Sequence, residues 1–315
     1  MEKKETFAIV GAGPSGGILA AYLAEAGHRV LLVDKIRAHI EAIRAAGLSV
    51  EGAVRKRVAI PDAMDDIRGL KGVAIDYLCI ATKTSAFVEV VGRLEEVLAP
   101  GTAVVAVQNG LDNEDYLAQF FSRNPVCRVV VNWAGGMIAP GRLQMVFFHP
   151  PNWVGAATPG AVDAARVLAA RMTAADLAAE YTEDIKRYEW EKTILNAAMS
   201  PTAALTGMTM TQVMENPSSR RLADRLLEEG IRVAEASGVR FEDGFFEHCI
   251  DYLSRAGHHK PSMAVDLDQG QRTEIDFLNG RIVANARRLG IAAPYHEQMT
   301  LLVQAAQDRV LAAKG

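Results

Sequence analysis

A glycine-rich turn close to the N-terminus constrains the fold more than any other feature of this sequence. Residues 11–16 read Gly-Ala-Gly-Pro-Ser-Gly and fit the pattern G-x-G-x-x-G. An apolar run at residues 7–10 precedes the turn, and apolar residues at helical spacing follow it. A second strand is expected at residues 29–33. This order predicts a βαβ unit over residues 6–33, the context in which the glycine pattern is informative.

The three glycines have distinct physical roles in such a unit. Gly11 permits a tight turn, Gly13 lets the backbone approach a pyrophosphate, and Gly16 lets the helix pack closely on the strand. The helix N-terminus adds unpaired N–H groups and a partial positive charge, which favour phosphate. The turn therefore predicts a dinucleotide cofactor. The predicted cofactor-binding residues of the turn are Gly11, Ala12, Gly13, Pro14, Ser15 and Gly16.

Asp34 ends the second strand, 18 residues after Gly16, and bears on which dinucleotide is bound. A carboxylate there accepts hydrogen bonds from ribose hydroxyls and repels a 2′-phosphate. Asp34 therefore favours NAD(H), while Lys35 and Arg37 nearby keep NADP(H) as an alternative. The competing interpretation of Asp34 is a helix N-cap or a solvent-facing carboxylate. The same turn also opens FAD-binding domains, but the second Gly-Asp segment of such flavoproteins is missing near the C-terminus.

Strands and helices keep alternating as far as about residue 183. Helices are expected at residues 39–46, 85–98 and 162–174, and strands at residues 48–50, 77–81, 102–107, 126–131 and 178–181, with a β-rich extension at 143–148 and 153–154. Such alternation is typical of a doubly wound parallel sheet.

From residue 184 the pattern is helical almost throughout. Breaks are expected at Pro201, Gly207, Asn216-Pro217, Gly238, His258–Pro261 and Gly290. We therefore predict an α/β fold, with an N-terminal Rossmann domain over residues 1–183 and a C-terminal all-α domain over residues 184–315.

Charge and composition narrow the class of protein. The formal net charge is −4 over 315 residues, so nothing favours nucleic acid as a partner. No apolar stretch approaches the roughly 18 residues of a membrane-spanning helix, and the start of the chain does not resemble a signal peptide. The three cysteines, Cys79, Cys127 and Cys249, have neither disulfide nor metal-ligand spacing. We expect a cytoplasmic protein without a membrane anchor or a metal site.

Two polar residues follow strands of the predicted sheet. Lys83 comes after the strand at 77–81, and Asn109 comes after the strand at 102–107 in a Gln-Asn-Gly turn. Ligands of open α/β sheets bind at the carboxyl ends of the strands. Lys83 and Asn109 are therefore candidate ligand contacts; the alternatives are a solvated lysine and a turn asparagine.

Three polar residues recur at helical spacing where the helical domain begins. Lys192, Asn196 and Ser200 are each four residues apart and share one face of a helix whose other residues are mostly apolar. Removing an ammonium group from water is costly and lowers its pKa, which suits a general acid. The alternative is a lysine whose charged end reaches the surface.

A third cluster lies within residues 261–280. Ser262 is expected to cap the helix that follows it, and the same hydroxyl can also contact a ligand. Glu274 is either a surface charge or a carboxylate that faces Lys192 across a cleft and helps to set its protonation state.

In order and spacing, these motifs resemble the ketopantoate reductase family (2-dehydropantoate 2-reductases) over nearly the whole chain. The matching motifs are the glycine turn, Lys83-Thr84, Gln108-Asn109-Gly110, Trp190-x-Lys192-x-x-x-Asn196, Ser262-Met263-x-x-Asp266 and Thr273-Glu274-Ile275-Asp276-x-x-Asn279-Gly280. The resemblance implies an active site in the cleft between a Rossmann domain and a helical domain. It also implies an oxidoreductase that uses NAD(P)H to reduce a 2-oxo acid to a 2-hydroxy acid, by default ketopantoate in pantothenate biosynthesis, and a homodimer.

The resemblance also implies roles for the candidate residues. Lys192 is the general acid, and Glu274 hydrogen-bonds the substrate hydroxyl or the cofactor end of the site. The two asparagines orient the substrate and the nicotinamide. The two serines contact the substrate, and Ser262 binds the carboxylate of that substrate. The lysine of the first domain contacts the cofactor. These residues are Asn109, Asn196, Ser200, Ser262 and Lys83.

Three residues depart from the family pattern. Ser200 stands where the pantothenate-pathway enzymes commonly have a second asparagine, and the apolar Met210 replaces a further polar contact; both positions help to hold the far hydroxyl of ketopantoate in those enzymes. Asp34 stands where the family commonly has a basic residue. Trp133 lies in a segment that is unusual for the family and is expected to shape a different pocket. The alternative function is therefore an NAD-dependent dehydrogenase of another hydroxy or oxo acid. A non-catalytic nucleotide sensor is the third hypothesis.

Overall fold

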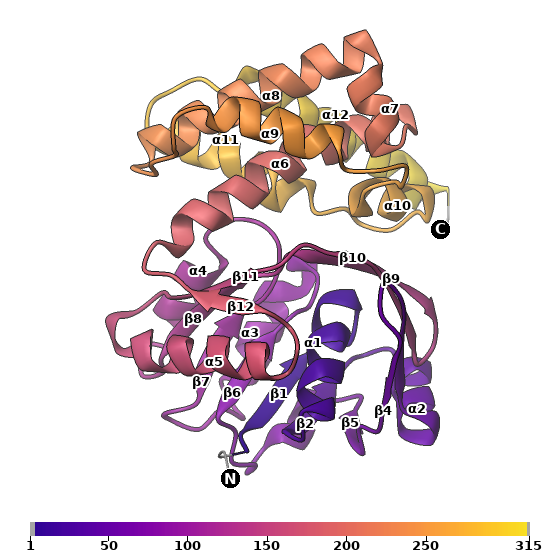
Figure 1. Ribbon diagram of the computed structural model, residues 1–315, viewed down its shortest axis with the longest axis vertical. Helices are drawn as coiled ribbons and strands as arrows, with labels where there is room; N and C mark the ends of the chain where they lie inside the picture. The colour runs from indigo at the N-terminus through magenta and orange to yellow at the C-terminus, as the bar shows by residue number, and fades with distance from the viewer. Residues whose placement is uncertain (1–3, 314–315) are drawn as a thin grey trace. The chain divides into compact units, whose positions relative to one another are not determined.

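The computed structural model describes residues 4–313 and divides the chain into two compact units (Figure 1). The first unit contains the chain up to Gln108 and then Asp112–Ile185. The second unit contains Asn109–Leu111 and the chain from Lys186 onward. The short segment Asn109–Leu111, which connects two parts of the first unit along the chain, therefore packs with the helical unit.

The first unit is built on a sheet of eight strands. In order across the sheet they are β12 (Ala179–Tyr181), β11 (Asn152–Ala156), β8 (Val126–Val130), β7 (Ala103–Ala106), β6 (Tyr77–Ile80), β1 (Thr6–Val10), β2 (Arg29–Val33) and β5 (Asp62–Met64). Neighbouring strands are parallel except β11, which runs antiparallel to β8. The chain builds the sheet outward from β1 to β5 and then in the opposite direction from β6 to β8, so the predicted doubly wound sheet is confirmed.

Helices cover both faces of this sheet. They are α1 (Pro14–Glu25), α2 (Arg37–Ala46), α3 (Phe87–Leu94), α4 (Asn113–Phe120) and α5 (Val162–Ala174). Successive residues of β1 enter different cores: Ile9 packs in the core that contains Leu168 of α5, and Val10 in the core that contains Phe87 of α3. Because both faces are buried, the strands read as continuous apolar runs, and this made them predictable.

A second, smaller sheet accompanies α1. Its strands are, in order, β4 (Lys56–Val58), β3 (Leu48–Gly52), β10 (Arg142–Phe148) and β9 (Trp133–Ala139). A Cβ on Gly17 of α1 would lie 2.4 Å from Leu143 Cδ1 of β10, so helix and sheet approach at a residue without a side chain. The β-rich extension is confirmed, whereas β4, β5 and β9 were not predicted because the first two are short and the third contains adjacent glycines.

The second unit is helical. Its helices are α6 (Ile185–Thr206), α7 (Met210–Glu215), α8 (Pro217–Ala236), α9 (Phe245–Ser254), α10 (Ser262–Asp268), α11 (Asn279–Arg288) and α12 (Pro294–Ala312), with a short 3-10 helix at Ile275–Phe277. No strand occurs in the part of this unit that the structure describes. Between residues 4 and 313, no helix combines the length and apolar content needed to cross a bilayer.

The break expected at Pro201 is wrong, because α6 continues through this residue to Thr206. Proline has no N–H, so Pro201 cannot serve the carbonyl of Ala197 four residues earlier. The side-chain amide of Asn279 donates to that carbonyl instead, over 2.9 Å. A contact from a distant segment thus allows a helix to continue where the local sequence predicts an interruption.

His296 is a buried titratable residue of α12. Its Nε2 lies 3.0 Å from the carbonyl oxygen of Leu226, and its Nδ1 lies 3.0 Å from Nδ2 of Asn279. Its backbone N–H donates to the carboxylate of Glu229 over 2.8 Å, and burial raises the pKa of that carboxylate. Burial lowers the pKa of His296 to about 4, because the charged ring is disfavoured inside the protein.

Acid is therefore expected to destabilise the fold through His296. In the unfolded chain the His296 ring is protonated below pH 6.5, whereas in the folded chain it is protonated only below about pH 4. The contribution of His296 to the free energy of unfolding is therefore fully present above pH 6.5 and is lost as the pH falls toward 4. The difference corresponds to about 3 kcal/mol. Urea unfolding of the wild type and of His296→Gln across this range tests the prediction. The wild type should lose more free energy of unfolding than the variant, and equal losses would contradict it.

Candidate active site

The glycine turn is shaped by two close backbone contacts and one open position. Gly11 has φ +104°, and a Cβ there would lie 2.7 Å from the carbonyl group of Ala81. A Cβ on Gly16 would lie 2.0 Å from the carbonyl oxygen of Gly11, so neither position accepts a side chain. At Gly13 a Cβ would meet nothing within 4 Å. The backbone is therefore exposed at the residue expected to face a diphosphate, and the turn fits a dinucleotide.

The N-terminus of α1 lies at the same place. Gly13 is its N-cap residue and Pro14 its first residue, no side chain caps this end, and the first turn contains no acidic residue. Proline is favoured at this position because its missing N–H would have no helical partner. The remaining N–H groups of the first turn and the helix dipole then favour an anion, as expected for a phosphate site.

Two side chains hold the peptide groups of Ala12. Its N–H donates to Oδ2 of Asp34 over 2.8 Å, and its carbonyl oxygen lies 3.0 Å from Nε2 of His39. The N–H of Gly141 donates to Nδ1 of His39 over 2.9 Å, so Nε2 carries the proton and donates to Ala12. Sequence reasoning missed His39, because its partner Gly141 lies about a hundred residues away along the chain.

Asp34 is neither a helix N-cap nor a fully exposed residue. Ile36 occupies the N-cap position of α2, and its N–H donates to Oδ1 of Asp34 over 2.9 Å. Each carboxylate oxygen therefore accepts one backbone N–H and retains a second lone pair. This geometry leaves acceptor capacity for ribose hydroxyls while Asp34 braces the turn.

The carboxyl ends of three neighbouring strands carry buried polar atoms that lack a hydrogen-bond partner among the described residues. Thr82 Oγ1 lies two residues after β6, and both amide atoms of Gln108 lie two residues after β7. Trp133 Nε1 belongs to the first residue of β9, three residues after the end of β8. Such atoms are costly when unpaired and often mark a place where a ligand or water binds. Lys83, predicted at this edge, is exposed beside Thr82. Sequence reasoning assigned no role in binding to Thr82 or Gln108.

The polar face predicted for α6 is present. Lys192, Asn196 and Ser200 all lie within this helix, the first two half-buried and the third buried. Their apolar neighbours, including Ile194 and Ala198, are fully buried in the core of the second unit. The helix thus carries these polar groups beside buried apolar residues, as the spacing indicates.

The cluster at residues 261–280 differs from expectation in one respect. Pro261 is the N-cap of α10, Ser262 is the first helical residue, and no side chain caps this end. The predicted capping role of Ser262 is wrong, because the extended residue before the helix is the proline. The Ser262 side chain is instead exposed. Glu274 is half-buried immediately before the 3-10 helix at Ile275–Phe277.

Asn109 belongs to the second unit, beside this 3-10 helix. A Cβ on Gly110, which has φ +94°, would lie 2.5 Å from the carbonyl oxygen of Phe277, so the two segments meet at a glycine. Leu111 packs in the same core as Ile275. The structure therefore brings the Asn109 turn next to the segment that begins at Glu274.

The predicted residues thus form two groups, one in each unit. The first unit holds the cofactor residues, namely the glycine turn, Asp34 and Lys83. The second unit holds the remaining predicted residues: Asn109, Lys192, Asn196, Ser200, Ser262 and Glu274. No cluster of three or more metal-ligating side chains exists between residues 4 and 313.

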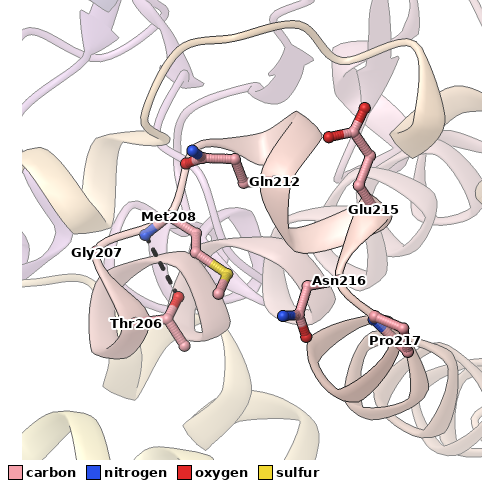
Figure 2. A pocket seen from close by; sticks show the side chains of 7 residues that line it. All are labelled: Thr206, Gly207, Met208, Gln212, Glu215, Asn216 and Pro217. Carbon is pink, nitrogen blue, oxygen red and sulfur yellow. Dashed lines mark hydrogen bonds between the residues drawn. The ribbon is translucent and has the colours of Figure 1, made fainter.

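A separate cavity of 580 Å³ lies at the C-terminal end of α6 (Figure 2). It is lined by Thr206, Gly207, Met208, Gln212, Glu215, Asn216 and Pro217. Asn216 caps α8 by accepting from two backbone N–H groups, and Gln212 closes the capping box of α7. These polar side chains have structural partners, and the lining contains none of the predicted site residues.

Two family models together match most of the chain. The model described as ketopantoate reductase PanE/ApbA matches residues 7–158, and the one described as its C-terminal region matches residues 184–307. The chain belongs to the ketopantoate reductase family. The resemblance inferred from the motifs is thereby confirmed.

Individual members of the family align with almost the whole chain. A 2-dehydropantoate 2-reductase of Streptococcus pyogenes serotype M6 is 29% identical over 299 residues, which are 94% of this chain and 96% of the relative. The enzyme of that name from Pyrococcus horikoshii is 28% identical over 300 residues, or 95% and 97% of the two chains.

Solved structures share the fold. A PanE/ApbA family ketopantoate reductase from Ralstonia eutropha JMP134 has a TM-score of 0.88 at 28% identity, covering 97% of this chain and 99% of its own. A D-mandelate dehydrogenase with NADH and anilino(oxo)acetate has a TM-score of 0.86 at 23% identity, with the same coverage, and shows similarity of fold alone.

The open position at Gly13 gives a prediction that separates folding from binding. Gly13→Ala should fold as stably as the wild type, since its backbone suits alanine and the added methyl meets no atom. The methyl should nevertheless obstruct a diphosphate and weaken NADH and NADPH binding by roughly tenfold or more. Thermal unfolding and fluorescence titration measure the two effects. Gly92→Ala, equally unobstructed in α3, is the control and should bind normally; unchanged binding by Gly13→Ala would refute the phosphate assignment.

Proposed function

We propose that this protein reduces a 2-oxo acid to a 2-hydroxy acid with NAD(P)H, with ketopantoate as the default substrate. The observation that carries the proposal is Lys192, which lies with Asn196 and Ser200 on one helix of a ketopantoate reductase family member. The relationship to enzymes named 2-dehydropantoate 2-reductase over nearly their whole length supports the same reaction.

The first unit would hold the dinucleotide. The turn at Gly11–Gly16 and the N-terminus of α1 bind the diphosphate, Asp34 accepts from ribose hydroxyls, and Lys83 contacts the cofactor at the edge of the sheet. The unpaired atoms of Thr82 and Gln108 supply further polar groups at this edge. When bound, the dihydronicotinamide ring supplies the hydride that the carbonyl carbon of the substrate accepts.

The second unit would bind the acid and supply the proton. Lys192 donates a proton to the carbonyl oxygen as it gains negative charge, and its own charge stabilises that oxygen beforehand. Glu274 hydrogen-bonds the hydroxyl or the cofactor end of the site. The remaining substrate contacts are Asn109 and Asn196, which orient substrate and nicotinamide, Ser200, and Ser262, which binds the carboxylate.

A second candidate is an NAD-dependent dehydrogenase of a different hydroxy or oxo acid. Ser200 is smaller than the asparagine common in pantothenate-pathway enzymes, and Met210 offers no hydrogen bond to a far hydroxyl. Asp34 favours NAD(H), although NADP(H) stays an alternative. The fold is also shared by a D-mandelate dehydrogenase with NADH, which shows that one architecture serves other acids.

Turnover measurements distinguish these candidates. A panel of 2-oxo acids with NADH and NADPH, and of 2-hydroxy acids with NAD+ and NADP+, should show the highest kcat/KM for the physiological pair. Ketopantoate as the best substrate supports the first candidate. A much higher kcat/KM for another acid supports the second, and no turnover of any member contradicts both.

We further propose a cytoplasmic homodimer. Cys79, Cys127 and Cys249 are buried free thiols, which suits a reducing compartment.

Leu301 and Leu302 of α12 are more than half exposed, and a ketopantoate reductase structure from Staphylococcus aureus is described as dimeric. Sedimentation velocity of the purified protein measures the oligomeric state, and a monomer at micromolar concentration would contradict the dimer.

Lys192→Ala should abolish most of the activity without loss of cofactor binding. Removing a general acid lowers kcat by roughly 10²- to 10⁴-fold. Lys192 is proposed to contact the substrate oxygen, whereas the diphosphate and ribose are proposed to bind at the glycine turn and Asp34, so the Kd for NADH should stay within about twofold of the wild-type value. Stopped-flow turnover and fluorescence titration of the same preparation give both numbers. Wild-type kcat in this variant would remove Lys192 from the mechanism.

Asp34→Ser tests the cofactor assignment through a ratio. Because Asp34 also holds the N–H of Ala12, the variant should bind both cofactors more weakly. The preference for NADH over NADPH should fall by about tenfold as well, since hydrogen bonds to a charged group are lost and the repulsion of a 2′-phosphate is removed. The ratio of the two kcat/KM values is the measurement. A wild type that prefers NADPH, or an unchanged ratio, would show that Asp34 does not select the cofactor.

A further inference from the structure

Helix α6 contains a backbone position that its own hydrogen bonds cannot satisfy. The carbonyl of Ala197 would normally accept from the N–H of residue 201, but Pro201 has no N–H. This turn of the helix lies between Asn196 and Ser200, so it separates two residues of the polar face. Proline within a helix usually produces a kink, and any change in direction at this turn would move Ser200 relative to Lys192.

The side chain of Asn279 fills this position. Its Nδ2 lies 2.9 Å from the carbonyl oxygen of Ala197 and 3.0 Å from Nδ1 of His296. Asn279 and His296 are both fully buried. A carboxamide nitrogen carries two hydrogens, and each is directed to one of these two acceptors.

His296 determines which way the amide of Asn279 is oriented. Its Nε2 faces the carbonyl oxygen of Leu226 at 3.0 Å, and a carbonyl oxygen only accepts, so Nε2 carries the proton. Nδ1 is then an acceptor and requires a donor from Asn279. This arrangement directs the NH2 group, and not the oxygen, toward Ala197. A Cβ on Gly230 would lie 3.3 Å from Nε2 of His296, so α8 approaches the ring at a residue without a side chain.

Asn279 is also close in sequence to the other half of the predicted substrate site. It is the first residue of α11, five residues after Glu274, and only the 3-10 helix Ile275–Phe277 and Leu278 follow Glu274 before it. Its hydrogen bond therefore joins the helix that carries Lys192 to the segment that carries Glu274. Aspartate lacks the two donors, and serine is shorter, so the geometry requires a carboxamide.

We propose that Asn279 is a positioning residue for the reaction. By donating to the carbonyl that Pro201 leaves unpaired, it fixes the course of α6 through this turn and thus the place of Ser200 relative to Lys192 and Asn196. It also holds this face in register with Glu274. The proposal rests on the function proposed above for these residues, but its physical element, the bond between Asn279 and Ala197, is open to a separate test.

A double-mutant cycle with Pro201 provides that test. Asn279→Ala should lower kcat for the best 2-oxo acid by roughly 10- to 100-fold, because small displacements of reacting groups are costly. The Kd for the dinucleotide should stay within about threefold of the wild-type value, since Asn279 contacts neither the glycine turn nor Asp34, where the diphosphate and ribose are proposed to bind. In the Pro201→Ala background, the backbone N–H restored at position 201 can serve Ala197. In this background, Asn279→Ala should lower kcat by no more than about threefold. A smaller effect than in the wild type indicates that the two residues are coupled.

Asn285→Ala is the matched control. Asn285 is buried on the same helix as Asn279, but its Nδ2 donates to the carbonyl of Arg281 within that helix. This variant should lower stability without changing kcat. If it lowers kcat as much as Asn279→Ala does, a general loss of packing explains the effect and the proposal fails.

Two further outcomes would overturn the proposal. One is an equal effect of Asn279→Ala in both backgrounds, which would mean that the amide does not act through the proline position. The other is a loss of stability with wild-type kcat, which would make the bond purely structural. If the wild type reduces none of the acids, the proposed function fails instead. In that case the unfolding equilibrium constants of the wild type, the two single variants and the double variant still show whether Asn279 and Pro201 are coupled. If the bond acts as described, the effect of Asn279→Ala on this constant should differ by roughly tenfold between the two backgrounds.

Discussion

The absence of side chains at Gly11 and Gly16 is the constraint on which the nucleotide half of the molecule depends. A Cβ on Gly16 would lie 2.0 Å from the carbonyl oxygen of Gly11, and a Cβ on Gly11 would lie 2.7 Å from the carbonyl of Ala81. Strand β1, helix α1 and the residue that follows strand β6 therefore approach one another closely at two positions without side chains. This convergence directs the N-terminus of α1 to the point where the sheet changes direction, which is where open α/β sheets bind ligands.

Elements whose signal is local were predictable. Strands β1, β2, β6, β7 and β8 are covered on both faces, so each reads as an apolar run and was found within about two residues of its observed bounds. Strands β4 and β5 span three residues each and are too short for any periodicity. Pro201 shows how a sound local rule fails, because the hydrogen bond that rescues the helix comes from Asn279, 82 residues away from the carbonyl it serves.

The same division applies to the site. The glycine turn, Asp34 and the face of Lys192, Asn196 and Ser200 were predictable because motif and spacing encode them. His39 was not, since only folding brings it between Ala12 and Gly141. The unpaired atoms at the ends of β6, β7 and β8 were missed for another reason, namely that hydrogen-bond satisfaction is a property of the packed structure and not of composition.

The position of Asn109–Leu111 has a consequence for how the chain is assembled. The polypeptide enters the second unit for three residues, returns to the first for Asp112–Ile185, and only then completes the helices. Leu111 is a fully buried member of the helical core, alongside Trp190 and Ile275. A C-terminal fragment that starts at Lys186 would thus lack the Leu111 side chain, which the ribosome adds long before the residues that surround it in this core. The core of the helical unit thus depends on a residue that precedes most of its helices by about 75 positions in the sequence, and a gene divided at residue 186 would leave a cavity in that core.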